Sequence, residues 1–309
     1  MNLIKKYPYI ITDLDGTIAG KGYLINPETY EALQTYQLAS NYHLFLASGR
    51  LDLMAKEYFA KLKIKTPIIS CNGALIRDSL TNEILYQQPL PQALALAVLT
   101  NAIEGNVDHI VYTANMVYGH PGSSRIAFML KYNAQLDNDN YLIPIDTETD
   151  YVSLLKNNEI EVLKILFPFD SSAELEQVQA IYQPFKNEVD GVFSQKDLFD
   201  IQALNINKGN AFKKLCVLKE YDPQQFIFYG DNYNDLELAK IVGYTVAMGN
   251  SVLEWHHVIE VQQINSERSW FFIEKKHYFI LRSLVTKYGK DIVINTVNKI
   301  VINNLKENE

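Results

Sequence analysis

The first apolar run of the chain, Tyr9-Ile10-Ile11, leads into the acidic stretch Asp13-Leu14-Asp15-Gly16-Thr17. This pattern predicts a buried strand that ends in a turn. Positions i and i+2 of a straight strand point to the same side, so Asp13 and Asp15 can face one site. Like charges held that close need a cation or a raised pKa. A hydrated turn explains the motif equally well when it is taken alone, because Asp and Gly are ordinary turn residues.

The composition is that of a soluble globular protein. The chain has 309 residues, of which 48% are hydrophobic and 21% charged, and this length suits two domains or one core with an inserted piece. The net charge of −8 argues against non-specific binding of nucleic acid or of an anionic membrane surface and favours a small ligand. No apolar run approaches the length of a membrane span, so we expect a cytoplasmic protein.

Neither the cysteines nor the histidines suggest a metal site. Cys71 and Cys216 lie far apart and outside any C-x-x-C pair, so we expect both to be buried, small apolar residues. The six histidines show no ligand spacing, and the adjacent pair His256-His257 is given no role. The loop Asp137-Asn138-Asp139-Asn140 begins like a calcium-binding loop but lacks the later ligands, which predicts a solvated loop without a metal.

Strands and helices alternate from the acidic turn to Gly73. The triplet Asn26-Pro27-Glu28 predicts a helix start with Asn as the cap. Nearly unbroken apolar strands are predicted at 42–47 and 68–71, with a helix at about 51–63 between them. This alternation is typical of a doubly wound, mainly parallel α/β sheet.

Between residues 83 and 191 the pattern becomes mixed. The expected elements are helices at about 90–103 and 171–182, a hairpin at 107–118 and a strand at 162–166. We interpret 83–191 as an inserted α+β domain, so the core consists of 1–82 and 192–309.

The core pattern is expected to resume after Gly191. The expected elements are a half-exposed strand at 199–204, a helix at 207–215, buried strands at 226–229 and 244–248, and two extra helices from about 276, broken near Gly289. The apolar faces of these two expected helices would offer a surface for an oligomer or another partner.

Polar residues gather where strands end and helices begin. The four clusters are Asp13 with Asp15, Ser48 with Gly49, Lys208, and Asp231 with Asn234 and Asp235. In an open α/β sheet such places converge on one crevice. Several carboxylates there call for a hard divalent cation, and Mg²⁺ is the usual choice where a phosphate shares its coordination sphere. A lysine, a hydroxyl and helix-start amides complement the charge of a phosphoryl group.

Each of these residues also has a plainer interpretation. Ser48 could cap the helix that begins near Arg50, and Lys208 could be a solvated residue at a helix start. Asp231 and Asp235 could form only the acidic first turn of a helix. Arg50 could bind substrate or pair with a neighbouring acid. The convergence of the clusters favours catalysis.

Five motifs in order resemble those of the haloacid dehalogenase-like phosphatases, in particular the Cof-like group with a large α/β cap. They are Asp13-Leu14-Asp15-Gly16-Thr17, Ala47-Ser48-Gly49-Arg50, Asn72-Gly73, Asn207-Lys208-Gly209 and Gly230-Asp231-Asn232-Tyr233-Asn234-Asp235, and Met248-Gly249-Asn250 agrees with them. The resemblance covers residues 9 to 250. It departs after Asn250, where residues 252–257 replace the small-residue helix of the family.

The resemblance implies a Rossmann-like core and a role for each matched residue. Asp13 would be the nucleophile that forms an aspartyl-phosphate, and Asp15 the general acid and base. Mg²⁺ would be held by Asp13, the backbone carbonyl of Asp15 and Asp231, with Asp235 in support. The implied phosphate-binding residues are Leu14, Ser48, Gly49, Lys208 and Asn234.

The implied activity is Mg²⁺-dependent hydrolysis of a small phosphate ester such as a sugar phosphate, a nucleotide or a cofactor phosphate. Two alternatives stay open: a phosphomutase of the same superfamily, and a non-catalytic regulator that binds a phosphorylated metabolite. Five residues of the inserted domain are candidates for facing the crevice, although surface or core positions suit them as well: Tyr112, Asn115, Tyr118, His120 and Arg125.

Overall fold

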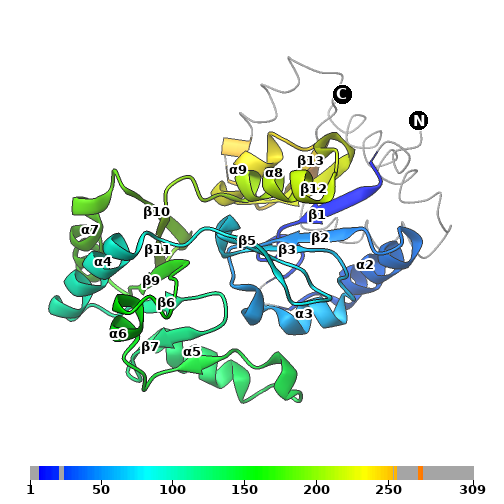
Figure 1. Ribbon diagram of the computed structural model, residues 1–309. Coiled ribbons are helices and arrows are strands. Elements are labelled where there is room, and N and C mark those ends of the chain that lie inside the picture. Colours follow the sequence, from blue (N-terminus) through cyan, green and yellow to red (C-terminus); the bar gives the residue numbers. More distant parts are fainter. Residues whose placement is uncertain (1–6, 21–23, 253, 256–270, 274–309) are drawn as a thin grey trace.

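The computed structural model describes residues 7–20, 24–252, 254–255 and 271–273 and contains two sheets side by side (Figure 1). The expected C-terminal helices and the pair His256-His257 lie outside the described residues. No helix among the described residues combines the length and apolarity needed to cross a bilayer.

The larger sheet has eight strands in the order β14-β13-β12-β1-β2-β3-β4-β5. The strands are β1 (Tyr9–Thr12), β2 (Leu44–Ala47), β3 (Ile68–Ser70), β4 (Leu75–Arg77), β5 (Ile84–Gln87), β12 (Phe226–Gly230), β13 (Tyr244–Met248) and β14 (Phe271–Ile273). All neighbours from β14 to β3 are parallel, and β4 and β5 add an antiparallel edge. The predicted α/β fold with a mainly parallel sheet is confirmed.

Helices cover both faces of this sheet (Figure 1). The helices are α2 (Pro27–Ala39), α3 (Lys56–Lys61), α8 (Lys208–Lys219) and α9 (Leu236–Ala239). Ile10 belongs to the hydrophobic cluster of Leu33 on α2, whereas its neighbour Ile11 belongs to that of Phe212 on α8. Successive strand side chains point to opposite faces, so two covered faces explain the unbroken apolar runs.

Of the helix starts predicted from local sequence, one is confirmed and another is wrong. Asn26 caps α2 as predicted, because its side chain accepts from the amides of Glu28 and Thr29. The single helix expected at about 51–63 is instead a 3-10 turn (Asp52–Met54) followed by the shorter α3. The helix is interrupted between them because Ala55, with φ −127° and ψ 10°, lies outside the helical region.

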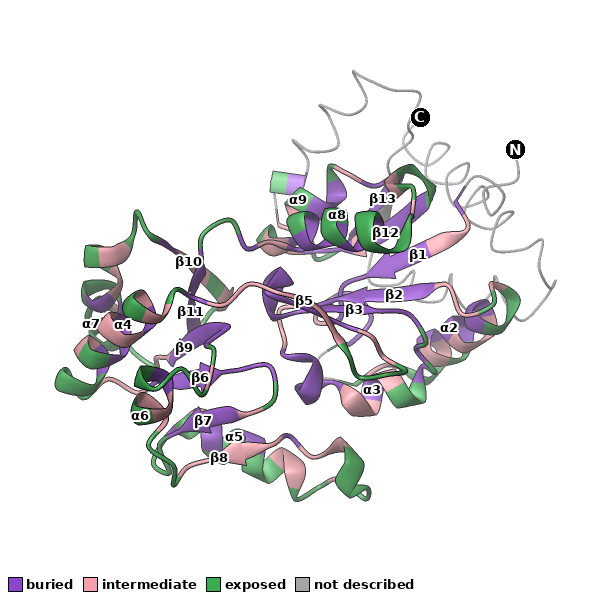
Figure 2. Ribbon diagram, in the orientation of Figure 1, coloured by how far each residue is buried: buried purple, intermediate pink, exposed green. Residues whose placement is uncertain are grey.

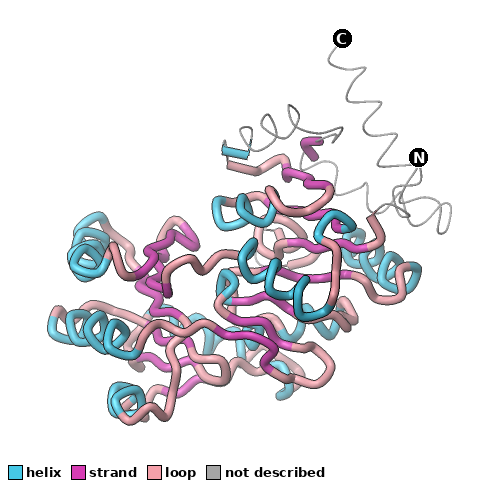
Figure 3. Tube along the Cα trace, turned by 45° about the horizontal axis from the view of Figure 1, so that its top comes forward, coloured by secondary structure: helices cyan, strands magenta, loops and turns pink. Residues whose placement is uncertain are grey.

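The smaller sheet has six strands in the order β10-β11-β9-β6-β7-β8. The strands are β6 (Ile110–Tyr112), β7 (Val117–Gly119), β8 (Ile145–Asp146), β9 (Lys164–Pro168), β10 (Val189–Gln195) and β11 (Leu198–Ala203). Its helices are α4 (Gln92–Glu104), α5 (Ser124–Asn133), α6 (Tyr151–Lys156) and α7 (Ser172–Tyr182). The predicted hairpin is the β6–β7 pair, and Figure 3 shows the two groups of strands with helices around them.

Strand β11 corrects two expectations. All six of its residues are buried rather than half exposed, and it pairs with β9 and β10 of the smaller sheet. Its polar residues face the interior because they find partners there: Asp200 meets Lys164, and Gln202 meets Asn72. The larger sheet therefore resumes after Ala203 and not after Gly191, while β5 extends it beyond residue 82 at the other boundary.

One hydrophobic cluster joins the two units. It combines Leu51 and Leu75 of the larger unit with Ile126 and Met129 on α5. The buried Arg77 on β4 also donates from Nη2 to the carbonyl of Ala114 in the β6–β7 turn, at 2.5 Å. Figure 2 shows buried residues on both sides of this boundary and exposed residues on the outer helices. We therefore treat the inserted unit as a cap packed on the core.

Candidate active site

Four parallel strands end at the same edge of the larger sheet. The residues that follow β1, β2 and β12 are Asp13, Ser48 and Asp231, and Asn250 stands just beyond β13. β1 lies between β2 and β12, so the strand order runs in one direction from β1 to β2 and in the other from β1 to β12. The edge where these strands end is therefore the topological switch point, the place where ligands bind in such sheets. The predicted convergence of the polar clusters is observed.

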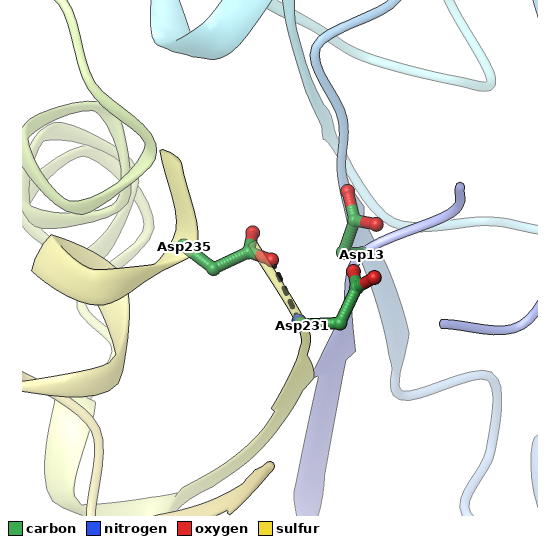
Figure 4. Close-up of side chains that lie close together, drawn as sticks. All are labelled: Asp13, Asp231 and Asp235. Atoms are coloured by element: carbon green, nitrogen blue, oxygen red, sulfur yellow. Dashed lines mark hydrogen bonds between the residues drawn. The ribbon is translucent and has the colours of Figure 1, made fainter. Parts of the chain in front are cut away.

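Three carboxylates form the centre of this edge (Figure 4). One oxygen each from Asp13, Asp231 and Asp235 lie within 4.8 Å of one another, and all three residues are buried. Burial, reinforced by the charge of Asp235, raises the pKa of Asp231 to about 7. Burial also raises the pKa of Asp13 well above its ordinary value, although Lys208 opposes this shift. The cluster therefore favours a bound cation.

Lys208 connects three of the motifs. Its Nζ donates to Asp13 Oδ1 at 2.5 Å and to Asp235 Oδ1 at 2.6 Å, and its side chain is fully buried. Burial alone would lower the pKa of Lys208, but the two carboxylates raise it above the ordinary value. Asn207 caps α8 through the amide of Asn210 and so fixes the start of the helix that carries the lysine. A solvated helix-start lysine is thereby ruled out.

Hydrogen bonds fix the position of both acids that follow β12. Asp235 Oδ2 accepts from the amides of Asp231 and Asn232 at 2.9 and 3.0 Å. Asp231 accepts from Thr17 Oγ1 at 3.1 Å and from Asn250 Nδ2 at 2.5 Å. The conformation of the 230–235 motif is therefore stabilised by hydrogen bonds to its own backbone amides and to Thr17 of the first motif.

Gly16 is required beside Asp231. Its φ is +86°, a region that residues with a side chain rarely adopt, and a Cβ there would lie 2.3 Å from Asp231 Oδ2. Both observations explain the glycine of the first motif.

Ser48, Gly49, Asn72 and Asn234 form one loop cluster. The Ser48 carbonyl accepts from the amide of Asn72 at 3.1 Å, and its hydroxyl accepts from the amide of Arg50, also at 3.1 Å. Asn234 Nδ2 donates to Asn72 Oδ1 at 3.0 Å. A Cβ on Gly49 would lie 2.8 Å from that same oxygen. The second and fourth motifs therefore meet at Asn72.

Arg50 pairs with the neighbouring acid Asp15. Its Nε and Nη2 donate to the two carboxylate oxygens at 2.7 and 2.5 Å. The Asp15 side chain is one-third exposed (33%), unlike that of Asp13 (7%). Of the two interpretations left open for Arg50, the structure shows the ion pair.

A cavity of about 280 Å³ lies between the core and the cap. The core contributes Asp13, Asp15, Gly49 and Asn234 to its wall, and the cap contributes Tyr112 and Arg125. The other three cap candidates do not line it: Tyr118 belongs to the cap core, His120 is exposed, and Asn115 accepts a hydrogen bond from Arg77. Five predicted site residues are not among the residues that line the cavity: Leu14, Ser48, Lys208, Asp231 and Asp235. The side chain of Leu14 belongs to a hydrophobic cluster, so only its backbone can serve a phosphate.

Comparisons with known proteins agree with this geometry. Residues 10–266 match the family model described as haloacid dehalogenase-like hydrolase. The chain belongs to this family. Pyridoxal phosphate phosphatase YbhA of Escherichia coli (strain K12) is 27% identical over 250 residues, which cover 78% of this chain and 88% of that protein. Putative phosphatase YkrA of Bacillus subtilis (strain 168) is 26% identical over 263 residues, covering 81% and 90%.

A solved structure shows the same fold. TM0651 from Thermotoga maritima superimposes with a TM-score of 0.70 at 20% identity, over 94% of this chain and 97% of that one. The resemblance to phosphatases with an inserted cap is thus confirmed for this haloacid dehalogenase-like hydrolase, although the roles of individual residues stay a proposal.

The acid cluster of this haloacid dehalogenase-like hydrolase can hold a metal ion. Its three carboxylates offer oxygen ligands, which hard divalent cations prefer. Lys208 is the cation that the structure places among the three carboxylates, where it contacts Asp13 and Asp235. Asp235 already accepts three hydrogen bonds, which leaves Asp13 and Asp231 as the carboxylates best able to contact a cation.

Sequence reasoning missed the buried pair of Lys164 and Asp200. Lys164 Nζ donates to Asp200 Oδ2 at 2.8 Å and to the carbonyl of Gly49 at 3.3 Å. The register of β9 and β11 pairs Lys164 with Gln202, so Asp200 is its diagonal neighbour on the same face. The sequence did contain a signal for this pair, because Lys164 and Asp200 each stand inside an otherwise largely apolar run.

Proposed function

We propose that the chain is a Mg²⁺-dependent phosphatase that hydrolyses a small phosphate ester through an aspartyl-phosphate on Asp13. The observation that carries the proposal is the double contact of Lys208 with Asp13 and Asp235, because it brings three separate motifs within hydrogen-bond distance. A cation there can neutralise both the nucleophile and a phosphoryl group.

In the first step, a carboxylate oxygen of Asp13 attacks the phosphorus atom, and the bond from phosphorus to the leaving oxygen breaks. Asp15 donates a proton to that oxygen. The phosphoryl oxygens would be bound by Lys208, the amide of Gly49 and Asn234. Both oxygens of Asp15 face Arg50 in the structure, so this ion pair must open for the proton transfer.

In the second step, Asp15 takes a proton from a water molecule whose oxygen attacks the same phosphorus atom. The bond from phosphorus to Asp13 breaks, which releases inorganic phosphate and restores the carboxylate. Mg²⁺, held by Asp13, Asp231 and the backbone carbonyl of Asp15, would supply positive charge to the phosphoryl oxygens when bound. Asp235 would keep Lys208 and the 231–232 amides in place.

The function is tested by measuring phosphate released from a panel of esters in Mg²⁺. The panel includes pyridoxal phosphate, because a relative is named for that substrate, together with sugar phosphates and nucleotides. We expect free phosphate from at least one ester. An isomerised sugar phosphate without free phosphate would indicate a phosphomutase, and the absence of turnover with every ester would contradict catalysis.

Mg²⁺ binding is expected to strengthen as the pH rises through about 7. Asp231 has a folded pKa of about 7 in the metal-free protein, above its unfolded value of 3.8, so its contribution to the free energy of unfolding is lost as pH rises between these values. The cation needs the carboxylate form and competes with the proton. Mg²⁺ should therefore raise the melting temperature more at pH 8 than at pH 5.5. Equal increases at the two pH values would contradict this.

A further inference from the structure

Two cationic side chains of the cap line the cavity opposite Asp13. Arg125 comes from the first turn of α5 and Lys164 from β9. Burial raises the pKa of Tyr112, and the charges of both cations oppose this rise, so both lie near that tyrosine. Lys164 Nζ is 4.9 Å from the centre of its ring. The cap side of the cavity wall therefore carries two cationic side chains.

The two cations differ in their partners. Lys164 forms an ion pair with Asp200, a residue that does not line the cavity. Arg125 has no ion pair with any residue that the structure describes, and its Nε is buried without a hydrogen-bond partner among them. Its guanidinium lies 4.8 Å from the ring centre of Phe128. A buried donor without an acceptor is destabilising unless a ligand or water supplies one.

We propose that Arg125 forms a second anion subsite, and that the substrate is a small phosphate monoester whose leaving group carries a carboxylate or a second phosphate. This inference rests on the proposed function, because it concerns the leaving group of the same reaction. The scissile phosphate lies at the Asp13 end, and the second oxyanion reaches the cap. A planar guanidinium suits either oxyanion. The volume of about 280 Å³ places the substrate at the small end of known ligands.

The test uses two pairs of ligands that differ in the second anion. Glycerol 3-phosphate is compared with 3-phosphoglycerate, which adds a carboxylate, and fructose 6-phosphate with fructose 1,6-bisphosphate, which adds a phosphate. Binding in Mg²⁺ is measured by calorimetry on Asp13→Asn protein, so no turnover is needed. We expect the anionic member of at least one pair to bind roughly tenfold more tightly or better. The pair that shows the preference identifies the oxyanion.

The preference should disappear when Arg125→Gln is added to the Asp13→Asn protein. The matched control is Lys131→Gln, which removes a charge from the last turn of the same helix at an exposed position outside the cavity and should retain the preference. The proposal is wrong if neither anionic ligand binds more tightly than its partner, if the preference survives Arg125→Gln, or if Lys131→Gln removes it equally. Wild-type phosphate release from p-nitrophenyl phosphate is measured separately, so a failure of the catalytic proposal is recognised independently.

Discussion

Replacing Asp13 with asparagine is expected to lower the turnover number for phosphate release at least about ten-thousandfold while the fold is preserved. An amide oxygen cannot act as the nucleophile, although it keeps the size of the side chain. The substitution does not alter the other partner of Lys208, the carboxylate of Asp235. Burial raises the pKa of Asp13, so removing its charge should leave the melting temperature of the metal-free protein unchanged or higher.

The measurement is phosphate release from p-nitrophenyl phosphate together with calorimetric unfolding. Asp137→Asn makes the same change on an exposed loop and serves as the control, with activity expected at the wild-type level. Near-normal release by Asp13→Asn would refute the nucleophile assignment.

Replacing Lys208 with methionine is expected to lower both stability and activity. The substitution keeps an unbranched side chain but leaves two buried carboxylates without their cation. Breaking such a buried ion pair costs about 3–5 kcal/mol, which corresponds to a fall in melting temperature on the order of 10 °C. The loss of a donor to the phosphoryl oxygens should lower the turnover number by about a hundredfold or more.

The pH dependence of stability and a second substitution distinguish the electrostatic effect of losing Lys208 from an effect of poor packing. Burial already raises the pKa of Asp13 in the wild type, and without Lys208 the shift grows, so the contribution of this carboxyl to stability is lost as the pH rises. Urea unfolding should show a larger deficit at pH 8 than at pH 5. Adding Asp235→Asn should restore part of the stability without restoring activity. If the loss of stability is the same at both pH values and is not reduced by Asp235→Asn, it reflects a packing defect only.

Local signals in the sequence were sufficient for the core and for the convergence of the polar clusters at one edge of the sheet. Apolar runs ending in polar residues predicted parallel strands, and parallel strands end at one edge, so Asp13, Ser48 and Asp231 were expected together before any coordinates. The cap of α2 at Asn26 is also local, because it depends on residues within three positions.

The errors about β11 and Lys164 concern partners that are distant in the sequence. Asp200 and Gln202 gave β11 the alternation of an exposed strand, but their partners Lys164 and Asn72 lie 36 and 130 residues away. The position of Lys164 at the cavity was missed for the same reason, because its partner Asp200 lies 36 residues away in the sequence. Arg50 was recognised as doubtful, and only the geometry shows that it pairs with Asp15.

The most direct test of the account is to trap the phosphorylated protein. Asp15→Asn removes the proposed base for the second step, whereas p-nitrophenolate leaves without protonation, so the aspartyl-phosphate should accumulate. The mixture is quenched in acid, reduced with borohydride and mapped by mass spectrometry. The account predicts one modified residue, Asp13, formed as p-nitrophenol is released. Release of p-nitrophenol with the modification on another residue, or with no modification, would contradict it.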